Sequence, residues 1–307
     1  GAPNANGTPG VGPGLARLFS GRDGSVLGLL TAPTGSSLFG AAVAGIEDLD
    51  GDGAGDLLIG AAGGSGRVHV VSGATGTNLF TLEGSVPGSI FGAGVAAIDD
   101  VDGDGLQDIV VGAPRSNGGR AFLYSSGTRV VLREFTPAVP GNTFGEFFVA
   151  DAGDVDADGT HDIYIGAYAE NNPNGAAYVF SGADGSRLHY IVGSAGEGVG
   201  PGRGAGDVDG DGHADLIIAS YSWSGGGVNR GGRVRVFSGA DGSVLQEMRG
   251  TVPNGEFGFD AEGIGDVTGD GRLDFLVSSA GAGDGRAYLF AGSVEQAVSF
   301  PSSTALS

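Results

Sequence analysis

The chain has 307 residues, with 36 acidic and 15 basic side chains, a formal net charge of −21 and no cysteine. This balance disfavours nucleic acid and anionic membrane surfaces as partners, because no basic face is available to neutralise phosphates. A disulfide framework is excluded. No apolar run approaches the ~18 residues that a membrane-spanning helix needs, so membrane insertion is not expected.

In chain order, residues 1–30 precede five repeated units that fill residues 31–300, and residues 301–307 are expected to form a C-terminal tail or linker. Each unit contains an acidic nonapeptide, and the steps between successive copies are 52, 54, 53 and 59 residues. A period of this length is typical of supersecondary units that stack or repeat radially. The copies begin at Asp48, Asp100, Asp154, Asp207 and Asp266.

Short apolar segments recur around each nonapeptide, such as LLIGA directly after Asp56 and RVHVV from Arg67. They are rich in Val, Ile, Phe and Tyr and bounded by Gly and Asp, which predicts strands. The 65 glycines oppose helices. The sequence therefore predicts an all-β fold, a β-propeller of four-stranded antiparallel blades. A β-sandwich and a linear β-solenoid are the alternatives, although a solenoid coil of ~20–30 residues is shorter than this unit.

The first 30 residues match only the second half of such a blade. Gly1-Ala2-Pro3 aligns with Gly112-Ala113-Pro114, which ends a second strand, and Ala16 to Gly21 aligns with a third strand. We therefore expect five full blades and an N-terminal half-blade, belonging to a parent propeller of six or seven blades.

The acidic loops carry oxygen donors at regular positions. In the first copy Asp48, Asp50, Asp52 and Asp56 stand at positions 1, 3, 5 and 9, and the carbonyl of Ala54 at position 7 is a further donor. Hard oxygen ligands in a tight loop with glycine at position 6 suit Ca²⁺. Aspartates that merely form turns are the alternative. Five matched copies favour about five structural Ca²⁺ ions, one per loop.

The other four loops repeat this ligand set with one change. Thr268 replaces the aspartate at position 3 of the fifth loop, so that site should be the weakest. The predicted metal ligands, with the position-7 residues acting through their carbonyls, are Asp48, Asp50, Asp52, Ala54, Asp56, Asp100, Asp102, Asp104, Leu106, Asp108, Asp154, Asp156, Asp158, Thr160, Asp162, Asp207, Asp209, Asp211, His213, Asp215, Asp266, Thr268, Asp270, Arg272 and Asp274.

A Phe-Gly pair precedes four of the five acidic loops, and Gly-Ala-Pro follows the second loop at residues 112–114. Together with the acidic loop, this order resembles the FG-GAP repeat of the integrin α-chain propeller and its bacterial relatives. The fourth unit departs from it, with GVGPGRGAG in place of Phe-Gly. The pairs are Phe39-Gly40, Phe91-Gly92, Phe144-Gly145 and Phe257-Gly258.

The resemblance implies that ligands bind at the loops on the face away from the calcium loops. The loops between the second and third strands hold exposed aromatics beside Asn and Arg, a composition that suits a sugar or a protein partner. The alternative is that Trp223 folds inward or packs on its own loop. The predicted ligand-binding residues are Tyr168, Asn172, Tyr221, Trp223, Asn229 and Arg230.

The sequence does not predict an enzyme. The histidines, His69, His161, His189 and His213, form no HExxH pair, and the chain has neither a GxSxG elbow nor a P-loop. The side chains of His161 and His213, within acidic loops, are expected to point to solvent.

The expected function is that of a calcium-stabilised module for recognition or adhesion, secreted or at the cell surface, with a protein or glycan ligand. The alternatives are a self-assembling subunit of an extracellular filament or surface layer, and the non-catalytic propeller of a larger secreted hydrolase.

Overall fold

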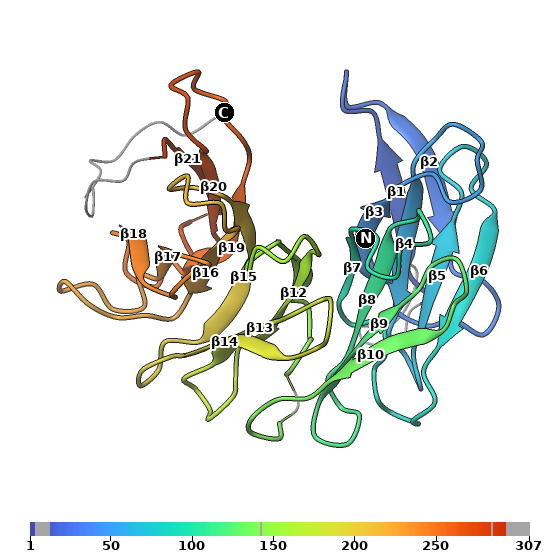
Figure 1. Cartoon of the computed structure of the whole chain (residues 1–307), viewed down its shortest axis with the longest axis horizontal. Helices are drawn as coiled ribbons and strands as arrows, with labels where there is room; N and C mark the ends of the chain where they lie inside the picture. The colour runs from blue at the N-terminus through green and yellow to red at the C-terminus, as the bar shows by residue number, and fades with distance from the viewer. Residues whose placement is uncertain (4–12, 142, 284, 293–307) are drawn as a thin grey trace. The chain divides into compact units, whose positions relative to one another are not determined.

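The computed structural model describes residues 1–3, 13–141, 143–283 and 285–292. Strands are the only regular elements found there, and no helix long and apolar enough to cross a bilayer occurs in this part of the chain. The chain divides into two compact units, Gly1–Val149 and Ala150–Ser307, each of which is described by itself (Figure 1).

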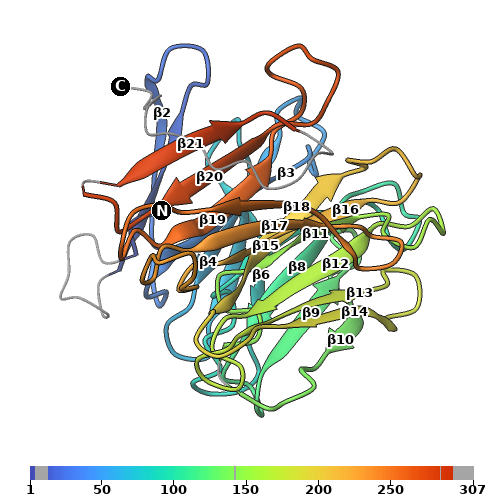
Figure 2. The same cartoon turned by 90° about the vertical axis from the view of Figure 1, so that its left-hand side faces the viewer.

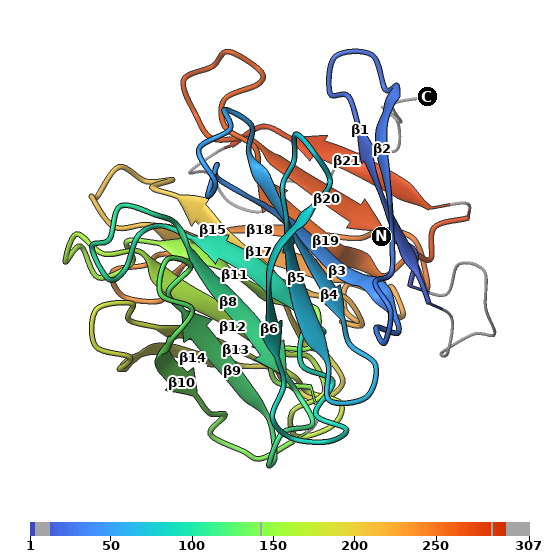
Figure 3. The same ribbon diagram turned by 90° about the vertical axis from the view of Figure 1, so that its right-hand side faces the viewer.

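The first unit contains one two-stranded sheet and two four-stranded sheets, all antiparallel (Figure 3). Strands that are consecutive in the chain lie side by side in each sheet, as expected of meanders. The sheets are β1 (Leu15–Phe19) and β2 (Val26–Thr31); β3 (Phe39–Ile46), β4 (Asp56–Ala61), β5 (Arg67–Val71) and β6 (Asn78–Glu83); and β7 (Val95–Ile98), β8 (Asp108–Ala113), β9 (Arg120–Tyr124) and β10 (Val131–Phe135).

The second unit holds two four-stranded sheets and one three-stranded sheet (Figure 2). Its strands are β11 (Val149–Gly153), β12 (Asp162–Ala167), β13 (Ala176–Phe180) and β14 (Arg187–Val192); β15 (Val199–Gly206), β16 (Asp215–Ser220), β17 (Arg233–Phe237) and β18 (Val244–Arg249); and β19 (Phe257–Gly263), β20 (Phe275–Ser279) and β21 (Arg286–Phe290).

The prediction of an all-β chain of four-stranded antiparallel blades is confirmed by four of these sheets. Three strands of the fifth predicted blade are seen, and its expected outer strand lies outside the described residues. The boundaries drawn at residues 30 and 300 stay predictions, although residues 15–31 form only a strand pair. The expected tail at 301–307 lies outside the described residues.

The Phe-Gly pair has a structural role between successive sheets of one unit. The backbone of Phe91 forms a parallel bridge with Gly66, which precedes β5 of the blade before it. The glycine of the pair, Gly92, adopts a φ of 84° that an L side chain rarely takes. Its carbonyl passes so close to β4 that a Cβ on Gly60 would lie 2.0 Å away. Both glycines are therefore needed for the blades to approach.

The core of each unit lies between the faces of neighbouring blades. In the first unit Leu58 and Val70 pack with Ile109 and Val111 of the next blade, and all four side chains are buried. In the second unit Ile217 and Val236 pack in the same way with Phe275 and Val277. These residues come from the second and third strands; β8 and β16 are buried on both faces, whereas β20 exposes Leu276 on one face.

Candidate metal-binding loops and a cavity at the opposite loops

All five acidic loops connect the first and second strands of a blade. The carboxylate at position 1 organises the loop: Asp48 accepts hydrogen bonds from the N–H groups of Gly51 (2.8 Å), Asp52 (3.1 Å) and Gly53 (2.7 Å). Gly53 has a φ of 92°, which explains the glycine at position 6. The equivalent carboxylates accept two or three such bonds each; they are Asp100, Asp154, Asp207 and Asp266.

The carboxylate at position 9 is buried and connects the loop to the rest of its blade. Asp56, 1% exposed, accepts the N–H of Leu49 at 2.9 Å and that of Gly73, beyond the third strand, at 3.1 Å. Every loop repeats this pair of bonds. The ninth residue, which the sequence assigns to metal binding, thus also joins the start of the loop, the start of the second strand and the segment after the third strand. The equivalents are Asp108, Asp162, Asp215 and Asp274.

Three carboxylates converge in each of the first four loops, those at positions 1, 3 and 9. In each set one oxygen per residue lies within 4.8 Å of the other two. Such clustered hard donors fit a divalent cation, which relieves the repulsion among them. The sets are Asp48, Asp50, Asp56; Asp100, Asp102, Asp108; Asp154, Asp156, Asp162; and Asp207, Asp209, Asp215.

The aspartates at position 5 do not belong to these convergent sets. Asp52 instead accepts the N–H of Ala54 at 3.0 Å and the hydroxyl of Ser72 at 3.0 Å. Asp104 makes the same two contacts, with Leu106 and Ser125. Metal binding through position 5, and through the carbonyls at position 7, stays a prediction.

The fifth loop differs from the others in its metal-binding potential. Among the residues that the structure describes, its carboxylates form no convergent set of three. Thr268 fills position 3, and its hydroxyl lies 3.4 Å from Asp274 Oδ1 as a hydrogen-bond donor. With one carboxylate fewer, this loop offers a divalent cation the poorest ligand set.

The electrostatics of the loops reflect burial of charge. Burial raises the pKa of Asp108 to about 6 and that of Asp162 to about 7, against the opposing effect of the N–H groups that each accepts. Burial also raises the pKa of Asp215. Carboxylates that are costly to keep ionised favour a bound cation.

The two histidines of these loops are half-exposed and also make hydrogen bonds, so the expectation that they point to solvent is met only in part. His161 Nδ1 lies 2.8 Å from Asp151 Oδ2 on β11. His213 Nδ1 lies 2.8 Å from the carbonyl oxygen of Val155, in the loop of the neighbouring blade. Each histidine thus contacts a residue outside its own acidic loop.

At the other end of the blades, the predicted ligand-binding residues of the second unit occupy different environments. Tyr168 and Tyr221 directly follow β12 and β16 and are half-buried; Tyr221 packs edge-to-face on Phe259, with ring centroids 6.0 Å apart. Asn172 and Asn229 are exposed. The side chain of Arg230 pairs with Glu256 at 2.7 Å.

Trp223 is half-buried and packs on two strands of its own blade, β17 and β18. The guanidinium carbons of Arg233 and Arg249 lie 4.9 Å and 5.3 Å from its ring centroid. Trp223 also lines a cavity of about 440 Å³, together with Arg230, and the other predicted residues do not line it. The lining residues are Pro173, Ser194, Ala195, Gly196, Glu197, Ser222, Trp223, Ser224 and Arg230.

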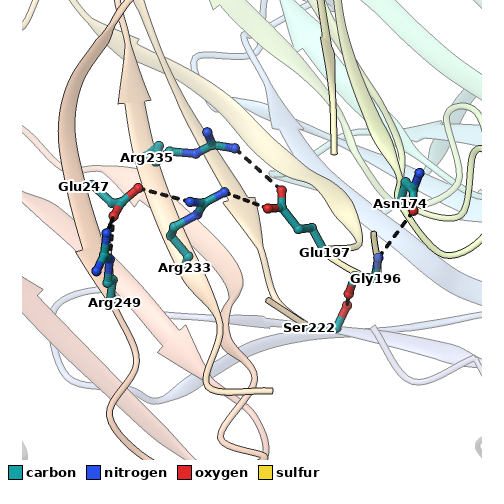
Figure 4. A network of polar contacts seen from close by, with 8 residues as sticks. All are labelled: Asn174, Gly196, Glu197, Ser222, Arg233, Arg235, Glu247 and Arg249. Atoms are coloured by element: carbon teal, nitrogen blue, oxygen red, sulfur yellow. Dashed lines mark hydrogen bonds and ion pairs between the residues drawn. The ribbon is translucent and has the colours of Figure 1, made fainter. Parts of the chain in front are cut away.

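An ion-pair network supports this cavity (Figure 4). Glu197, in the loop between β14 and β15, lies 3.0 Å from Arg233 and 3.9 Å from Arg235, both on β17. Arg233 also contacts Glu247 of β18 at 3.2 Å. These side chains are 9 to 17% exposed.

A pair of weaker contacts fixes the loop beside the network. The N–H of Gly196 donates to Asn174 Oδ1 at 3.3 Å, and the hydroxyl of Ser222 donates to the Gly196 carbonyl at 2.8 Å. Sequence reasoning missed Glu197 and its arginines, because isolated Arg and Glu in strands and turns carry no recognisable motif.

Family models of two related repeats match parts of this chain. The model of the FG-GAP-like repeat matches residues 100–165, and the model of the FG-GAP repeat matches residues 39–71 and 204–237. Each matched segment contains a second strand and at least one complete acidic loop. The chain is therefore an FG-GAP repeat protein.

Several integrin alpha chains are among the relatives that it matches. Identity is 38% over 117 residues with integrin alpha-4 of Xenopus laevis, covering 35% of this chain and 11% of that protein. It is 32% over 150 residues with integrin alpha-7 of Rattus norvegicus (44% and 13%) and 30% over 165 residues with integrin alpha-5 of Xenopus laevis (48% and 16%). This chain resembles the integrin alpha N-terminal domain. The matches span about one-eighth of the length of these relatives.

Proposed function

We propose that this chain is a calcium-stabilised, extracellular module for recognition or adhesion, which binds a protein or glycan through the loops opposite the acidic loops. The FG-GAP repeats and the similarity to integrin alpha chains support a role in binding rather than in catalysis. The observation that carries the proposal is the pairing of recurrent carboxylate sets at one end of the blades with a lined cavity at the other.

Calcium is the cation that fits the loops best. The donors are hard oxygens on short, flexible side chains, and Mg²⁺ demands a tighter octahedral shell. The ion would supply positive charge that holds the carboxylates of one loop together. Modular sites of this type fill at ~10⁻⁴–10⁻³ M Ca²⁺, which supports an extracellular location and one ion per loop.

Thermal unfolding with Ca²⁺, Mg²⁺ or a chelator tests the metal assignment. We expect Ca²⁺ to raise Tm and Mg²⁺ to have little effect. Asp50→Asn should reduce the Ca²⁺ response, whereas the control Asp23→Asn, in a turn outside the loops, should not. An unchanged Tm in excess chelator would refute structural calcium.

Screening on a glycan array and on purified extracellular-matrix glycoproteins tests the recognition assignment. Trp223→Ala should abolish binding, since a central aromatic residue typically accounts for ~2 kcal/mol or more. Phe19→Ala is the matched control, because Phe19 is an exposed aromatic residue of the first unit. Binding that survives Trp223→Ala and is lost with Phe19→Ala would place the ligand elsewhere.

A further inference from the structure

A chain of three polar side chains connects the segment before β3 with β5 and β6 in the blade β3–β6. Ser36, between β2 and β3, places its Oγ 2.9 Å from Nε2 of His69 on β5. On the other side of the imidazole, Nδ1 lies 3.1 Å from Oδ1 of Asn78 on β6. Because an amide oxygen only accepts, Nδ1 carries the proton, and Nε2 is left to accept the Ser36 hydroxyl.

The imidazole is held in the state that a general base requires. His69 is 4% exposed, and burial lowers its pKa, so the ring is neutral at pH 7. Its ring packs at 5.5 Å from that of Phe39, and Thr81 Oγ1 lies 3.2 Å from Nδ1. Contacts on several sides therefore fix the orientation of the ring toward Ser36.

Comparison among the repeats shows that the fold does not need a histidine here. His69 is the third residue of the third strand, and the same place is held by Phe122 in β9, Tyr178 in β13, Arg235 in β17 and Tyr288 in β21. Asn78 likewise corresponds to Val131 and Val244, each of which pairs with the last residue of the third strand. The combination of Ser, His and Asn is peculiar to this blade.

Ser36 opens into a cavity of about 270 Å³ that is also lined by Gly64 and Ser65. Within the described part of the chain, the backbone N–H groups of these two residues donate no hydrogen bond. Free N–H groups in a glycine-rich loop are the donors that stabilise an oxyanion. The ion pair between Arg67 and Glu83, at 2.9 Å, forms a polar wall of the same cavity.

We propose that Ser36 is a nucleophile for acyl transfer from small esters, with His69 as general base and Asn78 as the positioning residue. Ser36 Oγ bonds to the ester carbonyl carbon as its proton passes to Nε2. The carbon–oxygen bond to the alcohol then breaks, and Nε2 returns the proton to the alcohol. Water cleaves the acyl-serine by the same steps and releases the acid. The cavity volume and polar wall fit a short acyl group.

This activity goes beyond recognition, and its test is independent of any binding partner. The full chain is treated with a fluorophosphonate probe and with p-nitrophenyl acetate. We expect one labelled serine, which peptide mapping locates at Ser36, and slow ester hydrolysis. Ser36→Ala should remove both, whereas Ser37→Ala, which alters a second serine of the same cavity, should keep them.

Variants of His69 and Asn78 separate chemistry from structure. His69→Phe, the residue found at this place in β9, should slow labelling ~100-fold or more, the usual contribution of a general base, while Tm stays close to that of the parent. Asn78→Val should slow labelling and Asn78→Asp should restore it. Absence of labelling above the Ser36→Ala background, or equal labelling of His69→Phe, overturns the proposal and leaves Ser36 as a structural contact.

Discussion

The blades β3–β6 and β15–β18 fill one equivalent position in opposite ways. In the first, His69 meets the hydroxyl of Ser36 in a chain of neutral hydrogen bonds. In the second, Arg235 and its neighbour Arg233 meet the carboxylate of Glu197 in a buried ionic network. In both, the partner comes from the loop that enters the blade.

The blade β7–β10 shows the apolar version of this position. Phe122 lies there against Phe91 of the Phe-Gly pair, with ring centroids 6.2 Å apart. The two cavities described above adjoin the loops of the blades that hold His69 and Arg235. In the blade β11–β14 the position is held by Tyr178, whose hydroxyl donates to the buried carboxylate of Glu170. The comparison indicates that the repeat tolerates polar clusters at this place. The cluster of Ser36 and His69 is neutral, whereas that of Glu197, Arg233 and Arg235 is charged. The two clusters should therefore differ in how much unfolding free energy is lost when one member is removed.

Removing the carboxylate from the charged cluster should have the largest effect. Glu197→Leu leaves the guanidinium groups of Arg233 and Arg235 buried without their shared partner, and we expect a loss of roughly 3–5 kcal/mol in unfolding free energy. Ser36→Ala, in the neutral cluster, should cost only about 1 kcal/mol. Urea unfolding of both variants measures the difference.

The exposed pair of Arg120 and Glu134 supplies the control for that experiment. Glu134→Leu should cost less than about 1 kcal/mol, because surface ion pairs contribute little. Equal losses for Glu197→Leu and Glu134→Leu would show that the network is solvated and that the two clusters do not differ in kind.

The next largest loss of stability should come from removing the ninth aspartate of an acidic loop, and it should be the same in the blades β3–β6 and β15–β18. Asp56→Ala and Asp215→Ala each leave two N–H groups without their acceptor, at about 1–3 kcal/mol for each buried group. Measured with chelator present, the two variants should lose similar stability, because the ninth residue makes the same bonds in each loop. Stability retained by either variant would mean that its carboxylate acts only through a metal.

A gain of metal affinity extends the comparison to the fifth loop. Thr268→Asp restores the missing carboxylate, and calorimetric titration should show tighter Ca²⁺ binding, by about tenfold, or roughly 1.4 kcal/mol. Thr251→Asp, outside the loops, serves as the control for added charge. An unchanged titration would remove position 3 from the ligand set.

The smallest expected effect is a pH dependence found only in the neutral cluster. Burial places the pKa of His69 below the 6.5 of an exposed histidine. The stability that depends on neutral His69 is therefore complete above pH 6.5 and declines as the pH falls toward the folded-state pKa. Between pH 7.5 and 5, Tm of the parent should fall more than Tm of His69→Phe. Parallel curves would show that His69 titrates as it does in the unfolded chain.

The sequence predicted the features that repetition makes visible. The matched loops predicted carboxylates that the structure brings together at positions 1, 3 and 9 of the first four loops, and recurrent apolar runs predicted the blades. The roles of Gly60 and Gly92 in blade contact followed from no single pattern, since they depend on how closely two backbones pass.

What sequence reasoning missed depends on contacts between segments that carry no motif. Glu197 and Arg233 lie 36 residues apart, and Ser36 and His69 lie 33 residues apart. Only packing of the entering loop on the third strand brings such residues together. The environment of Trp223 was uncertain for the same reason, because its arginine neighbours come from two strands of its own blade.

The hydrogen bonds of the ninth aspartates have a consequence for how the chain is made. They join residues that are 7 positions apart in the loop and 17 to 24 apart across the blade. These hydrogen bonds can therefore form among the first three strands of a blade while the following blade is still being synthesised on the ribosome, because the bonds require no distant segment of the chain. The long insertion before β17 extends the span from 17 to 24 residues, at a loop-closure cost of only about 0.3 kcal/mol. Insertions at that point can thus diversify one loop without delaying closure of the blade that carries it.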